Sequence, residues 1–215
     1  MPMPRPVRSI APMALVAAIL LSACGGGSTR AASSAGGSPT GSNGESPSAA
    51  ASESPVPTEQ NPPGDIPDTI AFVPYTSKAG GFTISTPEGW SRTATPSSVT
   101  FTDKLNTIVV SWRDLTSPPT ISSVRAQEVA RLETSERAFT LGSVAGAMLP
   151  AGPAVVTTYQ ANSEPNTVTG QQYRLDVQRY SLYHDGTEFV VELRSPVGSD
   201  NVDPWRIVIE SFAWG

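Results

Sequence analysis

The sequence has few of the residues that form disulfides, zinc sites and proton-transfer sites. Its 215 residues include one cysteine, Cys24, and one histidine, His184. A single cysteine excludes an internal disulfide, and one cysteine with one histidine is too few ligands for a zinc site. Lysine is also scarce, since Lys78 and Lys104 are the only two. With a net charge of −5 and no basic patch, the chain is not expected to bind nucleic acid.

Aromatic residues are absent from the first third of the chain. The four Trp, five Tyr and six Phe residues all lie at or beyond Phe72. Residues 25–65 are instead dominated by Gly, Ser, Ala, Pro and Thr, and such a segment cannot bury enough apolar surface to fold. We therefore expect a disordered tether over residues 24–65 and a single globular domain over residues 66–215. The Ser, Thr and Pro content of the tether also suits glycosylation.

The N-terminus has the layout of a secretory signal. Arg5 and Arg8 precede an apolar run over residues 14–21 that is far shorter than the ~20 residues of a membrane span. The next residues complete Leu21-Ser22-Ala23-Cys24, which resembles the bacterial lipobox. We expect residues 1–23 to be a signal peptide and Cys24 to carry diacylglycerol and an acyl chain such as palmitate, anchoring the protein on the extracytoplasmic face of the cell membrane. A secreted protein with a chance cysteine is the alternative.

Alternating apolar and polar residues predict strands in the domain. One strand contains Phe82 and Ile84 and ends at the turn over residues 86–89. Two more, around residues 99–101 and 108–112, are joined by a hairpin turn at residues 103–106. Residues 122–137 change to the helical period, and we interpret Glu128, Arg131 and Glu136 as its solvated face. Two further strands are predicted at residues 139–149 and 154–161.

A clear hairpin and a closing helix complete the predicted domain. Asp185-Gly186 favours a type I′ turn between strands 171–184 and 187–195, which places Arg179 opposite Glu192. Asp203 and Pro204 suit the start of a helix whose residues 205, 208, 209 and 212 form an apolar stripe. Strands with a few added helices predict an α+β fold, an antiparallel sheet with helices packed on it.

The ten residues from Gly81 to Trp90, GFTISTPEGW, resemble the opening strand and turn of the PsbP-like proteins. The order of hairpin, long helix, strands and final helix is also similar to theirs, over about residues 70–214. The resemblance implies an α/β/α sandwich that binds other molecules and is not usually an enzyme. Plant members support the photosystem oxygen-evolving complex, a related yeast protein binds the Ran GTPase, and actinobacteria have lipid-anchored, LpqN-like members. Richness in Ala and Pro, with Arg in excess over Lys, also suggests a high-GC bacterial source.

No catalytic motif or cofactor-binding loop is evident, so we expect no cofactor and no enzyme activity. The main hypothesis is a lipid-anchored envelope protein whose partner is an envelope protein, a cell-wall glycan or a lipid. One alternative is an envelope hydrolase or esterase that uses His184 with a nearby Asp or Glu. Another is divalent-metal binding by the oxygen ligands of Asp200, Asn201 and Asp203, although these residues also suit the start of a helix.

Overall fold

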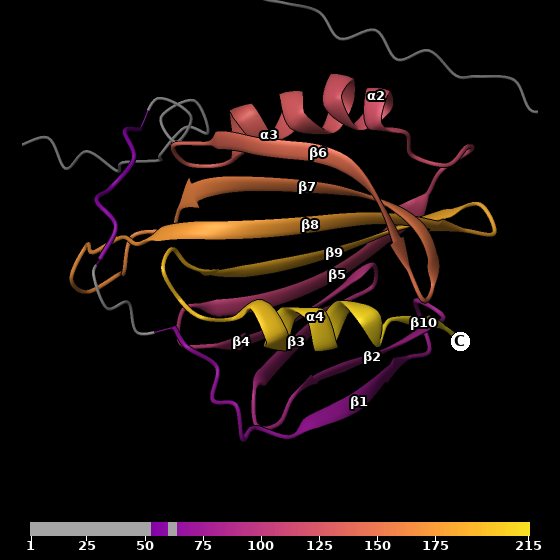
Figure 1. Cartoon of the computed structure of the whole chain (residues 1–215), viewed down its shortest axis with the longest axis horizontal. Coiled ribbons are helices and arrows are strands. Elements are labelled where there is room, and N and C mark those ends of the chain that lie inside the picture. Colours follow the sequence, from indigo (N-terminus) through magenta and orange to yellow (C-terminus); the bar gives the residue numbers. More distant parts are fainter. Residues whose placement is uncertain (1–52, 60–63) are drawn as a thin grey trace, which may run out of the picture. The chain divides into compact units, whose positions relative to one another are not determined.

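The computed structural model describes residues 53–59 and 64–215, which are drawn in colour in Figure 1. The predicted signal peptide, the lipidation site at Cys24 and most of the predicted tether lie outside the described residues. Within the described ranges, no helix is long and apolar enough to cross a membrane.

A seven-stranded antiparallel sheet forms the centre of the domain (Figure 1). Its strand order is β3-β4-β5-β9-β8-β7-β6. The strands are β3 (Ser91–Thr95), β4 (Ser98–Asp103), β5 (Asn106–Asp114), β6 (Thr140–Leu149), β7 (Gly152–Asn162), β8 (Arg174–His184) and β9 (Thr187–Pro196). Because strands consecutive in the chain are mostly neighbours in the sheet, short turns can make most of the connections.

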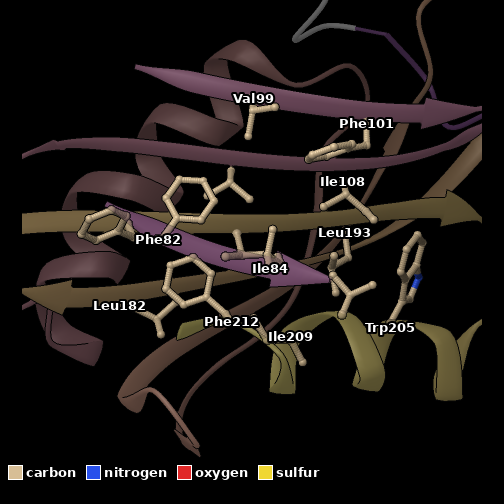
Figure 2. Close-up of a cluster of buried hydrophobic side chains, with 14 of the residues drawn as sticks. Phe82, Ile84, Val99, Phe101, Ile108, Leu182, Leu193, Trp205, Ile209 and Phe212 are labelled. Carbon is tan, nitrogen blue, oxygen red and sulfur yellow. The ribbon is translucent and has the colours of Figure 1, made fainter. Parts of the chain in front are cut away.

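One face of this sheet, the core side, carries the main apolar core. It is covered by a three-stranded sheet, β1-β2-β10, and by α4. These elements are β1 (Phe72–Ser77), β2 (Phe82–Pro87), β10 (Ala213–Trp214) and α4 (Val202–Glu210). Figure 2 shows Phe82 and Ile84 of β2 among side chains from the large sheet and α4. The Phe82 ring stacks on that of Phe212, with 5.4 Å between centroids.

The opposite face, the helix side, is partly covered by one helical run. The run consists of α2 (Ile121–Ser123), the π-helical segment η1 (Val124–Val129) and α3 (Ala130–Ser135). Its buried apolar residues are Val124, Val129 and Leu132, and they pack on side chains of β6, β7 and β8. Thr120 begins the run with a capping box to Ser123.

The structure confirms the predicted α+β fold class, because antiparallel strands form both sheets and the helices pack on the larger one. The predicted hairpin register is also confirmed: Arg179 lies opposite Glu192, and Asp185 and Gly186 have φ angles of 44° and 81°. The sequence interpretation missed β1, β3 and β10. These strands are short or lie at sheet edges, where apolar alternation is weak.

Residues 53–59 contact the domain, although the sequence places them in the tether. The side-chain oxygen of Asn162 accepts a hydrogen bond from the Val56 amide, and its nitrogen donates to the Ser54 carbonyl. Glu53 pairs with Arg137 at 3.3 Å. The amino-acid composition of this segment could not predict these contacts, because Asn162 lies about 100 residues later in the chain.

Candidate functional site

The helix side of the large sheet has an open half. The helical run packs over β6, β7 and β8, whereas the residues of β3, β4 and β5 on this side are exposed or half-buried. We call this open half the hydroxyl face. It consists of Ser91, Thr93, Thr95, Ser98, Thr100, Thr102, Thr107, Val109 and Ser111.

The strand register arranges the hydroxyl face in rows. Thr93, Thr100 and Val109 lie opposite one another across the three strands. The row on one side is Thr95, Ser98 and Ser111, and the row on the other is Ser91, Thr102 and Thr107. Eight of these nine residues are Ser or Thr and none is charged. Solvent-facing strand positions usually include Lys and Glu, so an uncharged array is a distinctive surface.

Several hydroxyls of this face are free to bind another molecule. Ser91 and Thr102 share a hydrogen bond of 2.7 Å, and Thr95 and Ser98 share one of 2.8 Å. In the described part of the chain, the hydroxyls of the remaining members make no hydrogen bond. The free hydroxyls are those of Thr93, Thr100, Thr107 and Ser111. Each can both donate and accept a hydrogen bond.

A chain of alternating charges lies between the hydroxyl face and the helix. Arg179 pairs with Glu128 at 2.7 Å and with Glu192 at 2.8 Å. Arg194 pairs with Glu192 and with Glu136, both at 2.6 Å. We call these five residues the charge ladder. It ties the helical run, through Glu128 and Glu136, to strands β8 and β9.

The arginines of the ladder set the pKa of Glu192, which lies between them. Burial disfavours the charged form of Glu192, but the neighbouring Arg194 and Arg179 outweigh it and lower the pKa of the Glu192 carboxyl below its ordinary value. Burial and the negative charge of Glu192 raise the pKa of Tyr159 well above its usual range, so its hydroxyl stays protonated. That hydroxyl donates a hydrogen bond to Glu192. The neighbouring charges therefore keep Glu192 ionised, and its charge helps to keep the Tyr159 hydroxyl protonated.

The interpretation of Glu128 and Glu136 as solvated helix residues is wrong. Glu128 is only 5% exposed, and the side chain of Glu136 is 15% exposed. Glu128 shares the inner stripe with Val124 and Leu132, four residues to either side, and it faces Arg179 on the sheet. Helical periodicity places Glu128 on the inner side of the helix. The charge pattern alone does not show that Arg179 of the sheet pairs with it. Arg131 is exposed as predicted.

Two adjoining cavities open between the helical run and the ends of β5 and β9. The larger has a volume of about 490 Å³ and the smaller about 190 Å³. Both are lined by Arg113, Arg131 and Glu188. The smaller also includes Ser98 and Ser111 of the hydroxyl face. We call these cavities the arginine groove, which thus continues the hydroxyl face at one end.

Three arginines line the groove, Arg113, Arg131 and Arg179, and Arg179 belongs to the charge ladder. Arg113 is 56% exposed, and its Nε donates to the buried Glu188 at 2.6 Å. Among the described residues, Arg131 has no ion-pair partner. The other acid of the groove, Glu128, is held by Arg179. The groove therefore presents one unpaired guanidinium and one that is only partly engaged.

The structure does not build a catalytic site around His184. Its ring stacks on that of Trp214, with 4.6 Å between centroids and 9° between planes. Its Nε2 lies 3.4 Å from the exposed carboxylate of Asp185. Within the described ranges, no hydroxyl or thiol is hydrogen-bonded to His184, so no nucleophile and base meet there.

The three candidate metal ligands near α4 have separate contacts. Asn201 is buried: its side-chain nitrogen donates to the Gly64 carbonyl at 2.9 Å, and its oxygen accepts from the Ile66 amide at 2.8 Å. Asp203 bonds Arg206 at 3.1 Å, and Asp200 is exposed. Among the described residues, no group of three or more His, Cys, Asp or Glu converges on one point.

The same contacts correct the predicted start of α4. Asn201, not Asp203, holds the N-cap position, and the helix begins at Val202. The Asn201 side chain makes no capping bond. Its amide is already engaged by Gly64 and Ile66, residues far away in the sequence. The predicted apolar stripe is confirmed, since Trp205, Val208 and Ile209 of α4 and the following Phe212 are all buried.

Comparison with known proteins adds remote structural likenesses. No protein-family model and no curated protein sequence matches the chain. Its structure is similar to cyanobacterial PsbP from Synechocystis, with 15% identity over 71% of this chain and 98% of that one and a TM-score of 0.49. The Ran-binding protein Mog1p of Saccharomyces cerevisiae gives 7% identity, 68% and 96% coverage and a TM-score of 0.45.

A third similar structure is LpqN of Mycobacterium tuberculosis, described as involved in cell envelope biogenesis. It gives 16% identity over 68% of this chain and 91% of that one, with a TM-score of 0.41. The groups named by the sequence resemblance are therefore among the similar structures. Because all three TM-scores are below 0.5, we draw no functional argument from them. The fold class rests on the sheets and helices themselves.

Proposed function

We propose that this chain is a lipid-anchored binding or accessory protein of the cell envelope and that it acts without catalysis. The observation that carries this proposal is the open hydroxyl face beside the arginine groove. The face is uncharged, its residues are exposed or half-buried, and four of its hydroxyls have no partner within the described part of the protein. Such a surface suits reversible binding through many hydrogen bonds.

The charges beside this surface favour binding over catalysis. A general base must be free to take a proton, and a nucleophile needs a base within hydrogen-bond reach. The two acids of the groove, Glu128 and Glu188, instead accept hydrogen bonds from arginines. The hydrolase alternative depends on His184, whose contacts with Trp214 and Asp185 give it no support.

The anchor is part of the proposal because of Leu21-Ser22-Ala23-Cys24, which lies outside the described residues. Two or more acyl chains make membrane binding stable, whereas one chain gives only marginal binding. The residues between Cys24 and Glu53 would hold the domain away from the lipid surface.

A Cys24→Ser variant should lose its membrane attachment. Without the thiol no lipid can be added, so we expect the protein in the medium or retained as an unprocessed precursor. Membrane fractionation with mass measurement of the N-terminus tests this, and circular dichroism should show an unchanged fold. A Ser22→Ala variant keeps the cysteine and a small residue, so it serves as a control that should stay anchored. Normal processing and full membrane retention of Cys24→Ser would contradict the proposed anchor.

The binding role is tested by capture from envelope extracts. The mature, lipidated chain in detergent is cross-linked to wall and membrane fractions, and a Thr100→Lys variant is compared with Thr83→Lys on the small sheet. Lysine at position 100 places a charge in the middle row of the hydroxyl face, so the captured material should fall at least roughly tenfold. Thr83→Lys should capture as the wild type does. Equal capture by all three proteins would show that the hydroxyl face is not the binding surface.

A further inference from the structure

We infer that the ligand of this surface is a glycan that carries an anionic group, with its hydroxyls on the hydroxyl face and its carboxylate or phosphate at Arg131 and Arg113. This inference rests on the proposed function and names the ligand class of the same site. It follows from two features that meet at one end of the sheet.

The first feature is the regular spacing of free hydroxyls. Neighbouring strands lie about 4.8 Å apart, and alternate residues along a strand lie about 6.7 Å apart. Thr93, Thr100 and Thr107 therefore belong to a two-dimensional array of groups that both donate and accept hydrogen bonds. A polysaccharide repeats hydroxyls of the same kind along its length, so its bonding capacity matches that of the array.

The chemistry of the face also argues against other partners. Protein interfaces gain most of their affinity from buried aromatic and arginine anchors, but Val109 is the only apolar member of the hydroxyl face and no member is aromatic. A lipid surface would need an apolar patch or several cations, and the face has neither. A neutral, hydroxyl-rich partner is the best match to these residues.

The second feature is the guanidinium pair of the arginine groove. Arg131 is exposed and has no ion-pair partner in the described part of the chain. Arg113 uses its Nε for Glu188, and its two terminal nitrogens make no hydrogen bond with any other residue that the structure describes. Planar guanidinium groups bind carboxylate and phosphate with paired hydrogen bonds.

The arginine groove lies at one end of the hydroxyl face, so the anionic group of the ligand would lie at that end. Ser98 and Ser111 line the smaller cavity and also belong to the hydroxyl face. A glycan lying along the face would therefore reach the arginines without leaving the surface. Glu128 and Glu188 each accept a hydrogen bond from an arginine, Arg179 and Arg113, which reduces their repulsion of an anionic substituent.

Fluorescence anisotropy with labelled polysaccharides tests the ligand class on the lipidated chain in detergent. The probes are oligogalacturonate, which carries carboxylates, phosphomannan, which carries phosphates, and neutral dextran. We expect one or both charged probes to bind at least roughly tenfold more tightly than dextran, with an affinity that falls as salt is added. The two charged probes distinguish a carboxylate ligand from a phosphate ligand.

Two variants separate the contributions of the two features. Arg131→Gln should weaken binding of the charged probe roughly tenfold and leave dextran unaffected, because Arg131 makes no ion pair with another described residue. Arg206→Gln is its matched control, since Arg206 lies on the other side of the sheet, in α4, and is 56% exposed.

A triple Thr93→Val, Thr100→Val and Thr107→Val variant should weaken binding of both the charged probes and dextran. Its control is Thr76→Val with Thr83→Val on the small sheet.

The outcomes distinguish this inference from the proposed function. If dextran binds as tightly as the charged probes, or if Arg131→Gln and Arg206→Gln behave alike, the ligand is not an anionic glycan. Capture of an envelope protein that Thr100→Lys abolishes, with no polysaccharide bound, would also overturn the ligand class while upholding the binding role. Failure to capture any envelope component would overturn the proposed function itself.

Discussion

A Glu192→Ala variant is expected to unfold at a much lower urea concentration than the wild type. Glu192 is 5% exposed and accepts hydrogen bonds from both Arg179 and Arg194. Its removal leaves two guanidinium groups in the charge ladder without their shared partner. Breaking a buried ion pair by deleting one side costs about 3–5 kcal/mol, and Arg179 and Arg194 then keep only Glu128 and Glu136 as ion-pair partners.

The matched control is Glu164→Ala. Glu164 also pairs with an arginine, Arg137 at 3.1 Å, but its side chain is 81% exposed. Exposed pairs contribute about 0–1 kcal/mol, so this variant should unfold almost as the wild type does. If the two variants lose the same stability, the ladder does not hold the helical run on the sheet. Glu192→Gln, which keeps the side-chain volume, supplies the measurement if the alanine variant does not fold.

Glu192 should also make the stability of the protein depend on pH. The pKa of Glu192 is lower in the folded protein than its ordinary value of 4.5, so folding favours the ionised carboxylate. Its contribution to the unfolding free energy is therefore complete above pH 4.5 and is lost as pH falls through the folded-state pKa. The stability difference between the wild type and Glu192→Gln should shrink in that acidic range. A difference that stays constant down to the folded-state pKa of Glu192 would contradict the ion-pair origin.

Local sequence signals predicted the parts of the fold that depend on neighbouring residues. Asp185-Gly186 fixes the turn, and the turn fixes the register that places Arg179 opposite Glu192. The apolar stripe of α4 was predicted for a similar reason, because helical periodicity alone selects the buried side. In both cases the partners lie within one hairpin or along one helix.

Features that depend on distant partners could not be predicted in this way. Glu128 is buried because Arg179, 51 residues later, meets it, and Asn201 is buried because Gly64, 137 residues earlier, accepts its hydrogen bond. The hydroxyl face does have a sequence signal, the alternating Ser and Thr at positions such as Thr93 and Thr100. The alternation shows that these residues share a side of the sheet, but not that the helix leaves that side open.

Phe82→Ala is expected to cause the other large loss of stability. Phe82 is fully buried, and its ring lies 5.6 Å from Trp112, 6.2 Å from Phe189 and 5.4 Å from Phe212. These rings belong to β5, to β9 and to the segment after α4, so Phe82 joins the small sheet to the large one. Replacing a buried Phe by Ala costs about 3–5 kcal/mol, which is the lost burial plus the cavity left behind.

The control for this prediction is Phe72→Ala in β1. Phe72 is only half-buried at the edge of the same core, so its replacement should cost clearly less. Urea unfolding followed by tryptophan fluorescence measures both variants, because Trp112 reports directly on the Phe82 contact. Phe82→Leu, which leaves a smaller cavity, should fall between the wild type and Phe82→Ala. If Phe82→Ala is no more harmful than Phe72→Ala, the small sheet is held by its edges and α4, and the aromatic cluster is not the joint between the two sheets.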